Sequence, residues 1–309
     1  MNLRSFLKPL RSSGRRASSL VPASTLAVAV AACLAGVGSL FGGASDERGG
    51  TLVEARAPSE TNLDAEEFFR QGQFAESTKD WVAAAKYYRR AARLGHAPSQ
   101  NNLGFLLLRG LGGDRNPQEA VRWFRDGARQ GYPAAQNNLG VCYRDGEGVK
   151  QDAGAAAKWF LQAAEQGLAE AQNNLGVRFY LGSGMPKNTE AAIEWYRKSA
   201  DQGFAGAWIN LGICHLEGRG FPKDANEAFE LFCKAAEKGD ADGLLNLGFA
   251  HMEGKGVAKD LVKAYVCFNT AVTYGDTYAR QARSKLKGMM TEKQIAEANR
   301  LTYEKATGR

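Results

Sequence analysis

The chain has 309 residues, of which 44% are hydrophobic and 24% are charged, and its formal net charge is +7 at pH 7. Five basic residues and no acidic residue lie in the first 45 positions, so the remainder carries 35 basic and 33 acidic side chains. A body this close to neutral excludes the electrostatic argument for nucleic-acid binding.

The first 45 residues have the layout of an export signal or an N-terminal membrane anchor. Basic residues up to Arg16 precede an apolar segment from Leu20 to Phe41, as in a signal peptide. Val30-Ala31-Ala32-Cys33 resembles a lipoprotein cleavage box, in which Cys33 is the lipidated residue. An uncleaved apolar span of about 20 residues also crosses a bilayer. We therefore expect an exported protein, periplasmic or anchored to the envelope through this segment alone.

A mitochondrial presequence is the alternative, because the first 26 residues are rich in arginine and serine and contain no acid. In that case the chain would be an organelle-imported assembly factor. In either case, the polar residues 46–61 are predicted to form a flexible linker.

Glycine recurs with a period of 36 residues along the rest of the chain. The triplet Asn-Leu-Gly ends at Gly104, Gly140, Gly176, Gly212 and Gly248. A second glycine series has the same period and another phase: Gly95, Gly131, Gly167, Gly203, Gly239 and Gly275. Such a period predicts an array of stacked units and not a single pocket enzyme.

Each unit is predicted to contain two helices. The second helix should begin after a side chain that accepts hydrogen bonds from free backbone amides: Asp80, Asn116, Asp152, Asn188, Asp224 and Asp260. One alanine per unit predicts close helix packing: Ala84, Ala120, Ala156, Ala192, Ala228 and Ala264. Three residues later, we expect aromatic side chains to fill the space between helices: Tyr87, Trp123, Trp159 and Trp195. The closing glycines, such as Gly131 and Gly167, should be left-handed.

The sequence from Asn137 to Tyr143, followed by Gly146 to Val149, Asp152, Ala156 and Gly167, resembles the Sel-one-like repeat (SLR), a relative of the tetratricopeptide repeat (TPR). The resemblance covers five units in residues 97–276, and residues 62–96 look like a plain TPR. It implies an all-α, right-handed α/α solenoid of helix-turn-helix repeats. Residues 277–309 should form capping helices and a tail, with Thr291 and Gln294 as a capping box. This closed end predicts a monomer.

The resemblance implies a non-enzymatic scaffold or adaptor that binds a protein or peptide in its concave groove. Carried over by position, the groove would contain one row of asparagines, one row of mainly apolar residues, and four further residues. The asparagines are Asn102, Asn138, Asn174, Asn210 and Asn246. The apolar row is Phe105, Val141, Val177, Ile213 and Phe249. The further residues are Tyr180, Trp208, Leu216 and Met252.

Both rows have a structural alternative. An asparagine in every unit can tie adjacent helices together, and apolar residues can form ordinary core between helices. The row preceding the groove asparagines changes from asparagine at position 173 to Ile209 and Leu245, and Trp208 replaces glutamine. We therefore expect the more apolar contact zone in the C-terminal half.

No catalytic, metal or cofactor site is predicted. The five cysteines show no zinc spacing, and we interpret them as buried or half-buried thiols. His215 and His251 occupy a position that holds aromatic residues in other units, so we expect them to stack on successive first helices. Some cysteine-rich SLR relatives are described as β-lactamases, but the Ser-x-x-Lys match at Ser5 lies in the targeting segment, and the tail from Lys305 to Gly308 does not read Lys-Thr-Gly. A cell-wall accessory role that uses Tyr180 and Trp208 to bind glycans is a minor alternative.

Overall fold

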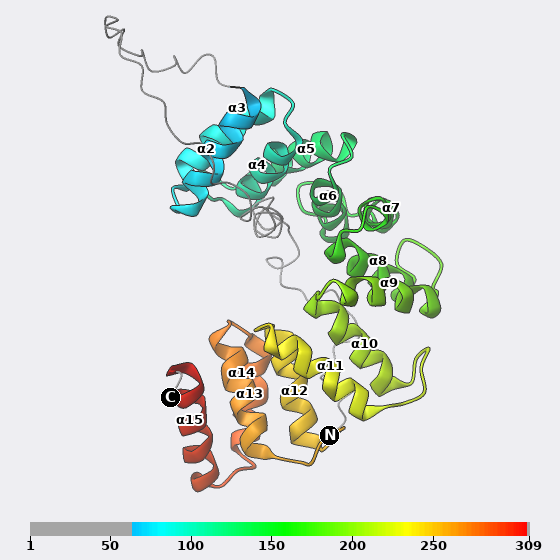
Figure 1. Ribbon diagram of the computed structural model, residues 1–309, viewed down its shortest axis with the longest axis vertical. Coiled ribbons are helices and arrows are strands. Elements are labelled where there is room, and N and C mark those ends of the chain that lie inside the picture. Colours follow the sequence, from blue (N-terminus) through cyan, green and yellow to red (C-terminus); the bar gives the residue numbers. More distant parts are fainter. Residues whose placement is uncertain (1–63, 308–309) are drawn as a thin grey trace, which may run out of the picture. The chain divides into compact units, whose positions relative to one another are not determined.

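The computed structural model describes residues 64–307. The predicted export segment, Cys33 and the 46–61 linker lie outside this range. Residues 64–307 form fourteen α-helices and no strand (Figure 1), as the all-α prediction requires. Two compact units divide the chain after Ala163, inside helix α7, and each is described by itself. None of the fourteen helices is both long and apolar enough to span a bilayer.

Residues 64–163 contain three helix pairs. Their helices are α2 (Ala65–Ser77), α3 (Trp81–Arg93), α4 (Ala97–Arg109), α5 (Pro117–Arg129), α6 (Pro133–Asp145) and α7 (Ala153–Glu165), whose last two residues lie beyond the division. Contacts join α2 to α3, α3 to α4, α4 to α5 and α5 to α6, and the first helices α4 and α6 also touch. Each helix thus packs on its neighbours in sequence, as stacked repeats require.

Residues 164–307 continue with the same construction. Their helices are α8 (Ala169–Leu181), α9 (Thr189–Asp201), α10 (Ala205–Glu217), α11 (Ala225–Glu237), α12 (Ala241–Glu253), α13 (Leu261–Thr273), α14 (Thr277–Lys287) and α15 (Glu292–Thr307). Helix α10 packs against α9 and α11, and it also touches the next first helix, α12. Successive first helices therefore lie beside one another within this unit.

The predicted helix starts and ends are confirmed. The Oδ1 atom of Asp152 accepts from the Ala155 amide at 2.9 Å, and the other five predicted N-cap residues accept in the same way. Gly131 and Gly167 are left-handed, with φ of 83° and 90°. A side chain at that φ would be strained, which explains why glycine closes the units.

The core confirms one half of the packing prediction and corrects the other. All six alanines of the predicted series are 0% exposed. The predicted aromatic series was off by one position, because Tyr87, Trp123, Trp159 and Trp195 are only partly buried. The next residue of each helix is the fully buried one: Tyr88, Phe124, Phe160, Tyr196, Phe232 and Phe268.

The C-terminal helices close the array as predicted. Helix α13 contacts both α14 and α15 (Figure 1). Ala298 of α15 is 0% exposed and belongs to the same core cluster as Phe268 of α13 and Leu286 of α14. Thr291 and Gln294 form the expected capping box, with the Thr291 amide donating to Gln294 Oε1 at 2.9 Å. Helices α14 and α15 therefore cover apolar surface of the last repeat.

Candidate functional site

The asparagine row belongs largely to the packing between units. Asn138 Nδ2 donates to Asn101 Oδ1 of the preceding first helix at 2.8 Å. Asn210 Nδ2 donates to Asn173 Oδ1 at the same distance, one repeat apart. Asn102, Asn138 and Asn174 are at most 9% exposed. Here the structure favours the alternative interpretation, in which these amides tie successive first helices together.

This asparagine ladder stops at α10. Ile209 and Leu245 stand where earlier units have the accepting asparagine. Asn246 consequently donates to the Asp242 carbonyl of its own helix at 2.8 Å, and its side chain is partly exposed. The C-terminal first helices are therefore held together by apolar packing, and Asn246 remains in contact with solvent.

The apolar row is mostly core. Val141, Val177, Ile213 and Phe249 are between 1% and 8% exposed, which again supports the structural alternative. Phe105 is partly exposed and lies against Arg109, whose guanidinium carbon is 5.3 Å from the ring centroid. Side chains this buried offer a partner almost no contact area.

Tyr180 is also buried, contrary to its predicted place in the groove. Its ring is 3% exposed, and its hydroxyl donates to Glu217 Oε2 at 2.9 Å. The Arg219 guanidinium lies 5.2 Å from the ring centroid. Tyr180 therefore joins α8 to the end of α10, and it offers no face on which a sugar ring can stack.

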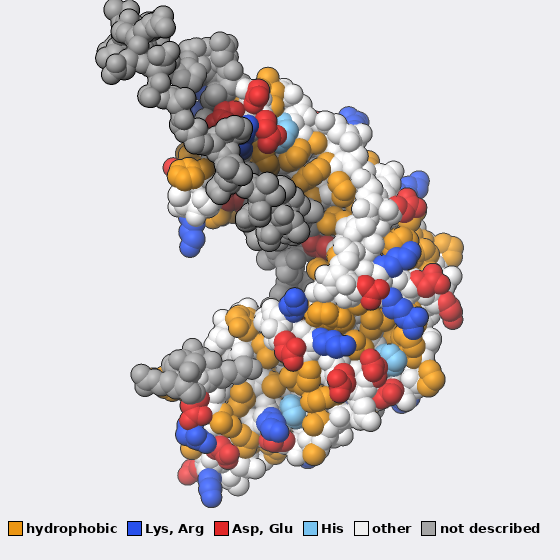
Figure 2. Space-filling view, viewed as in Figure 1, with side chains coloured by type: hydrophobic (Ala, Val, Ile, Leu, Met, Phe, Trp, Pro, Cys, Tyr) orange, Lys and Arg blue, Asp and Glu red, His pale blue; other side chains and the backbone are white. Residues whose placement is uncertain are grey.

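The remaining predicted residues lie on α10 and α12. Trp208, Leu216 and Met252 are partly exposed and pack at the edges of the core clusters. Together with Leu245 and Asn246 they are referred to below as the α10–α12 face. Figure 2 shows hydrophobic side chains interspersed with charged ones on the visible surface of this unit. A hollow beside the face, lined by Leu216, Asn246 and Phe249, measures only about 10 Å³, so it has no room for a small-molecule ligand.

The two histidines pack on phenylalanine rings and do not take the expected form of a stack between successive first helices. His215 stacks on Phe221, with ring centroids 4.1 Å apart and planes inclined by 9°. His251 meets Phe229 edge-on at 5.4 Å. Burial lowers the pKa of His251 below 6.5, and the nearby Lys263 adds to this effect. Both rings thus replace an aromatic packing residue, as their position in the repeat indicates.

The described cysteines are free thiols. Cys142, Cys214 and Cys267 are buried and Cys233 is partly buried, which confirms the packing interpretation. Burial raises the pKa of Cys142 and of Cys214 to about 12, so neither forms a nucleophilic thiolate near neutral pH. Within residues 64–307, no three His, Cys, Asp or Glu side chains gather as a metal site.

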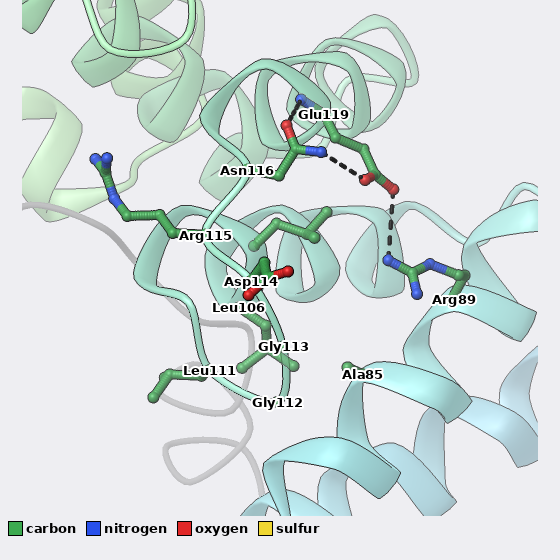
Figure 3. Close-up of a pocket in the computed structure, with 11 residues that line it drawn as sticks. Ala85, Arg89, Leu106, Leu111, Gly112, Gly113, Asp114, Arg115, Asn116 and Glu119 are labelled. Atoms are coloured by element: carbon green, nitrogen blue, oxygen red, sulfur yellow. Dashed lines mark hydrogen bonds and ion pairs between the residues drawn. The ribbon is translucent and has the colours of Figure 1, made fainter.

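Sequence reasoning missed one cavity, which lies in residues 64–163 between α3, α4 and the α4–α5 loop (Figure 3). Its volume is about 320 Å³. Arg89 Nη2 lies 3.5 Å from Glu119 Oε1, and Asn116 Nδ2 donates to Glu119 Oε2 at 3.2 Å. The signal in the sequence was Gly113, which stands where the later units have an apolar side chain.

A family model described as Sel1 repeat matches residues 67–96, 97–132, 133–168, 169–204, 208–240 and 241–273. The chain belongs to the Sel1 repeat family. The match at 67–96 includes the unit that we expected to be a plain TPR. Sel1 repeats generally mediate protein interactions, and proteins built from them are generally non-enzymatic scaffolds.

Two solved Sel1 structures resemble the chain. The Sel1 repeat protein from Oxalobacter formigenes is 29% identical with a TM-score of 0.65, over 77% of this chain and 96% of that one. A protective antigen of uropathogenic Escherichia coli with an SLR fold is 31% identical with a TM-score of 0.60, over 78% of this chain. The match spans 54% of that antigen. The search among curated proteins returned no match.

Proposed function

We propose that this Sel1 repeat protein is a non-enzymatic adaptor that binds a protein or peptide segment through its α10–α12 face. The observation that carries the proposal is the end of the asparagine ladder. Up to α10, asparagine side chains bond from one first helix to another, fully buried at Asn138 and Asn101 and partly buried at Asn210 and Asn173. Beyond it, Asn246 bonds within its own helix, and Leu245 is partly exposed beside it.

The composition of this face suits an extended or helical segment of a partner. Trp208, Leu216 and Met252 offer apolar contact area, and tryptophan in particular is enriched at the energetic centres of interfaces. Methionine adapts to different partner shapes. The Asn246 side chain carries both a donor and an acceptor, which can bond to a partner's backbone. A peptide lying over the face thus meets apolar contacts together with a polar anchor.

Export to the cell envelope is the second part of the proposal. It rests on the basic and then apolar residues 1–45, with Cys33 in a lipoprotein-like box. The protective-antigen description of the Escherichia coli relative fits an exported chain. The mature protein should begin after this segment, or at a lipidated Cys33, when its N-terminus is sequenced. If the mature N-terminus instead follows a cleaved arginine-rich presequence and the protein is found in mitochondria, the organelle-imported alternative holds and export does not.

Site-specific photocrosslinking in the native host tests the binding face. A photoreactive phenylalanine analogue at Met252 should give a discrete adduct whose partner is identified by mass spectrometry. The same analogue at the exposed Glu230 of α11 is the matched control, because it lies in the same unit on a second helix. Equal adducts from both positions, or none from Met252, would count against the face.

A further inference from the structure

We propose that the cavity between α3, α4 and the α4–α5 loop binds an aromatic side chain of a basic partner peptide. The cavity is lined by Ala85, Arg89 and Leu107, and by the loop residues Gly113 and Asp114 among others (Figure 3). Its volume of about 320 Å³ falls within the range of ligand pockets. The other units of the same chain indicate which kind of side chain occupies it.

The cavity exists because small residues stand at two positions that meet where the 67–96 unit adjoins the first 36-residue unit. At the position of Gly113, the later units have Val149, Met185, Phe221 and Val257. At the position of Ala85, they have Val121, Ala157, Ile193 and Phe229. Gly113 and Ala85 are the pair with the smallest side chains among these repeat junctions, so this place in the fold is left unfilled.

The unit three repeats later shows what fills this place. There, Phe221 stacks on His215 at 4.1 Å between ring centroids. The Arg197 guanidinium carbon lies 5.2 Å from the same ring centroid. Ile193 and Phe221 belong to one core cluster. In the register of the repeat, Arg197, His215 and Ile193 correspond to Arg89, Leu107 and Ala85, which all line the cavity.

Arg89, Leu107 and Ala85 therefore surround a space that holds no aromatic ring. An arginine beside the place of the ring is retained, and a guanidinium attracts an aromatic face. Gly112 is left-handed, with φ of 76°, and lies against the Trp81 carbonyl, so no larger residue fits there. A Cβ at Gly113 would meet no atom within 4 Å. The contact at Gly112 thus holds the loop in place, while the space beside Gly113 stays empty. This arrangement favours an aromatic ring supplied by another molecule.

The charges at the cavity specify a basic partner. Arg89 is paired with Glu119 at 3.5 Å. Arg115 forms an ion pair with Glu147 and points away from the cavity in Figure 3. Asp114 is exposed and has no ion-pair partner among residues 64–307. Its carboxylate is thus available to a lysine or arginine next to the aromatic residue.

This site rests on the proposed function only in that its ligand is a peptide, and it lies outside the α10–α12 face. Its test uses the full chain with ¹³C-labelled alanine and leucine methyl groups and the probe N-acetyl-Phe-Lys-amide. Saturable shifts are expected at Ala85, Leu106 and Leu107. N-acetyl-Ala-Lys-amide should give none, and N-acetyl-Phe-Glu-amide should bind more weakly.

The decisive variants change Gly113. Gly113→Phe restores the ring of the later unit and should remove the shifts, whereas Gly113→Ala leaves the cavity open and should retain them. If the phenylalanine variant fails to fold, Gly113→Val reproduces Val149 and should weaken binding about tenfold. The proposal is overturned by wild-type shifts that do not saturate, or by binding that persists in a folded Gly113→Phe chain. Shifts that follow protein concentration would assign the cavity to a second copy and also overturn it. None of these outcomes bears on crosslinking at Met252, so the two proposals fail separately.

Discussion

Gly140 of α6 faces the ring of Phe160 in α7 so closely that a Cβ on the glycine would lie 2.8 Å from Phe160 Cε1. Phe160 is 0% exposed, so its ring has no room to withdraw. The same glycine of every other unit meets the corresponding buried ring of Phe124, Tyr196, Phe232 or Phe268. Glycine therefore recurs in the series from Gly104 to Gly248 because the two helices of each unit are in close contact there.

Gly140→Ala should destabilise the fold by about 1–3 kcal/mol, because it overfills a packed core. Gly113→Ala is the matched control, since a methyl group there meets nothing within 4 Å, and its effect should stay within about 0.5 kcal/mol. Chemical denaturation followed by circular dichroism measures both. Equal stability of the two variants would mean that the glycine is not required by the phenylalanine ring.

Asn138→Ala should lower the free energy of unfolding by about 1–3 kcal/mol. It removes a buried hydrogen bond to Asn101, and water does not reach this place to replace it. Asn246→Ala should cost less than about 0.5 kcal/mol, since this partly exposed amide bonds only to its own helix in the structure. The difference in urea midpoint between the variants tests the ladder. A larger loss for the Asn246 variant would reverse the roles that we assign to them.

Stability should fall as the pH drops below 6.5, in part through His251. Burial lowers its folded pKa, so the unfolded chain binds the proton more readily. The stability that the neutral ring contributes is complete above the unfolded pKa of about 6.5 and is lost as the pH falls through the folded value. His251→Phe keeps an aromatic ring in contact with Phe229 and removes the titrating group. This variant should therefore lose less stability than the wild-type protein between pH 7.5 and about 5.5. The same pH dependence in both proteins would remove His251 from this account.

Thiol labelling should follow burial. Cys142 and Cys214, with pKa values raised to about 12, should stay unlabelled by iodoacetamide at neutral pH until the chain unfolds. Cys233 is only partly buried and should react first among the four described cysteines. Peptide mass spectrometry separates these sites from Cys33. Rapid labelling of native Cys142 would contradict the packing role that we assign to the buried cysteines.

The sequence predicts the repeat boundaries and the helix starts because these depend on local chemistry. Asp152 caps its helix and Gly167 is left-handed whatever lies opposite them. Packing depends on which side of a helix meets its neighbour, and here the period was ambiguous. Trp159 and Phe160 both recur every 36 residues, but only Phe160 is fully buried. Adjacent positions carry the same periodic signal, so the array alone could not separate them.

The same ambiguity explains the outcome for the groove residues. Tyr180 recurs in phase with partly exposed Leu216 and Met252, and Val141 recurs in phase with partly exposed Phe105, yet the structure buries both Tyr180 and Val141. Tyr180 is buried because Glu217 accepts its hydroxyl hydrogen bond, a contact between residues 37 positions apart that one unit's pattern does not contain. Positions that depart from the repeat pattern predict the candidate sites better than positions that follow it. Leu245 marks the end of the asparagine ladder, and Gly113 marks the open cavity.

The central claim is that the α10–α12 face binds a protein or peptide segment, and the affinity of the crosslinked partner for purified variants tests it most directly. Met252→Asp combined with Asn246→Ala should weaken binding by at least about tenfold, with helicity and urea midpoint close to the wild-type values. Glu230→Lys, on the exposed side of α11, should leave the affinity unchanged. Unchanged affinity in the folded double variant, or an equal loss in Glu230→Lys, would contradict the claim.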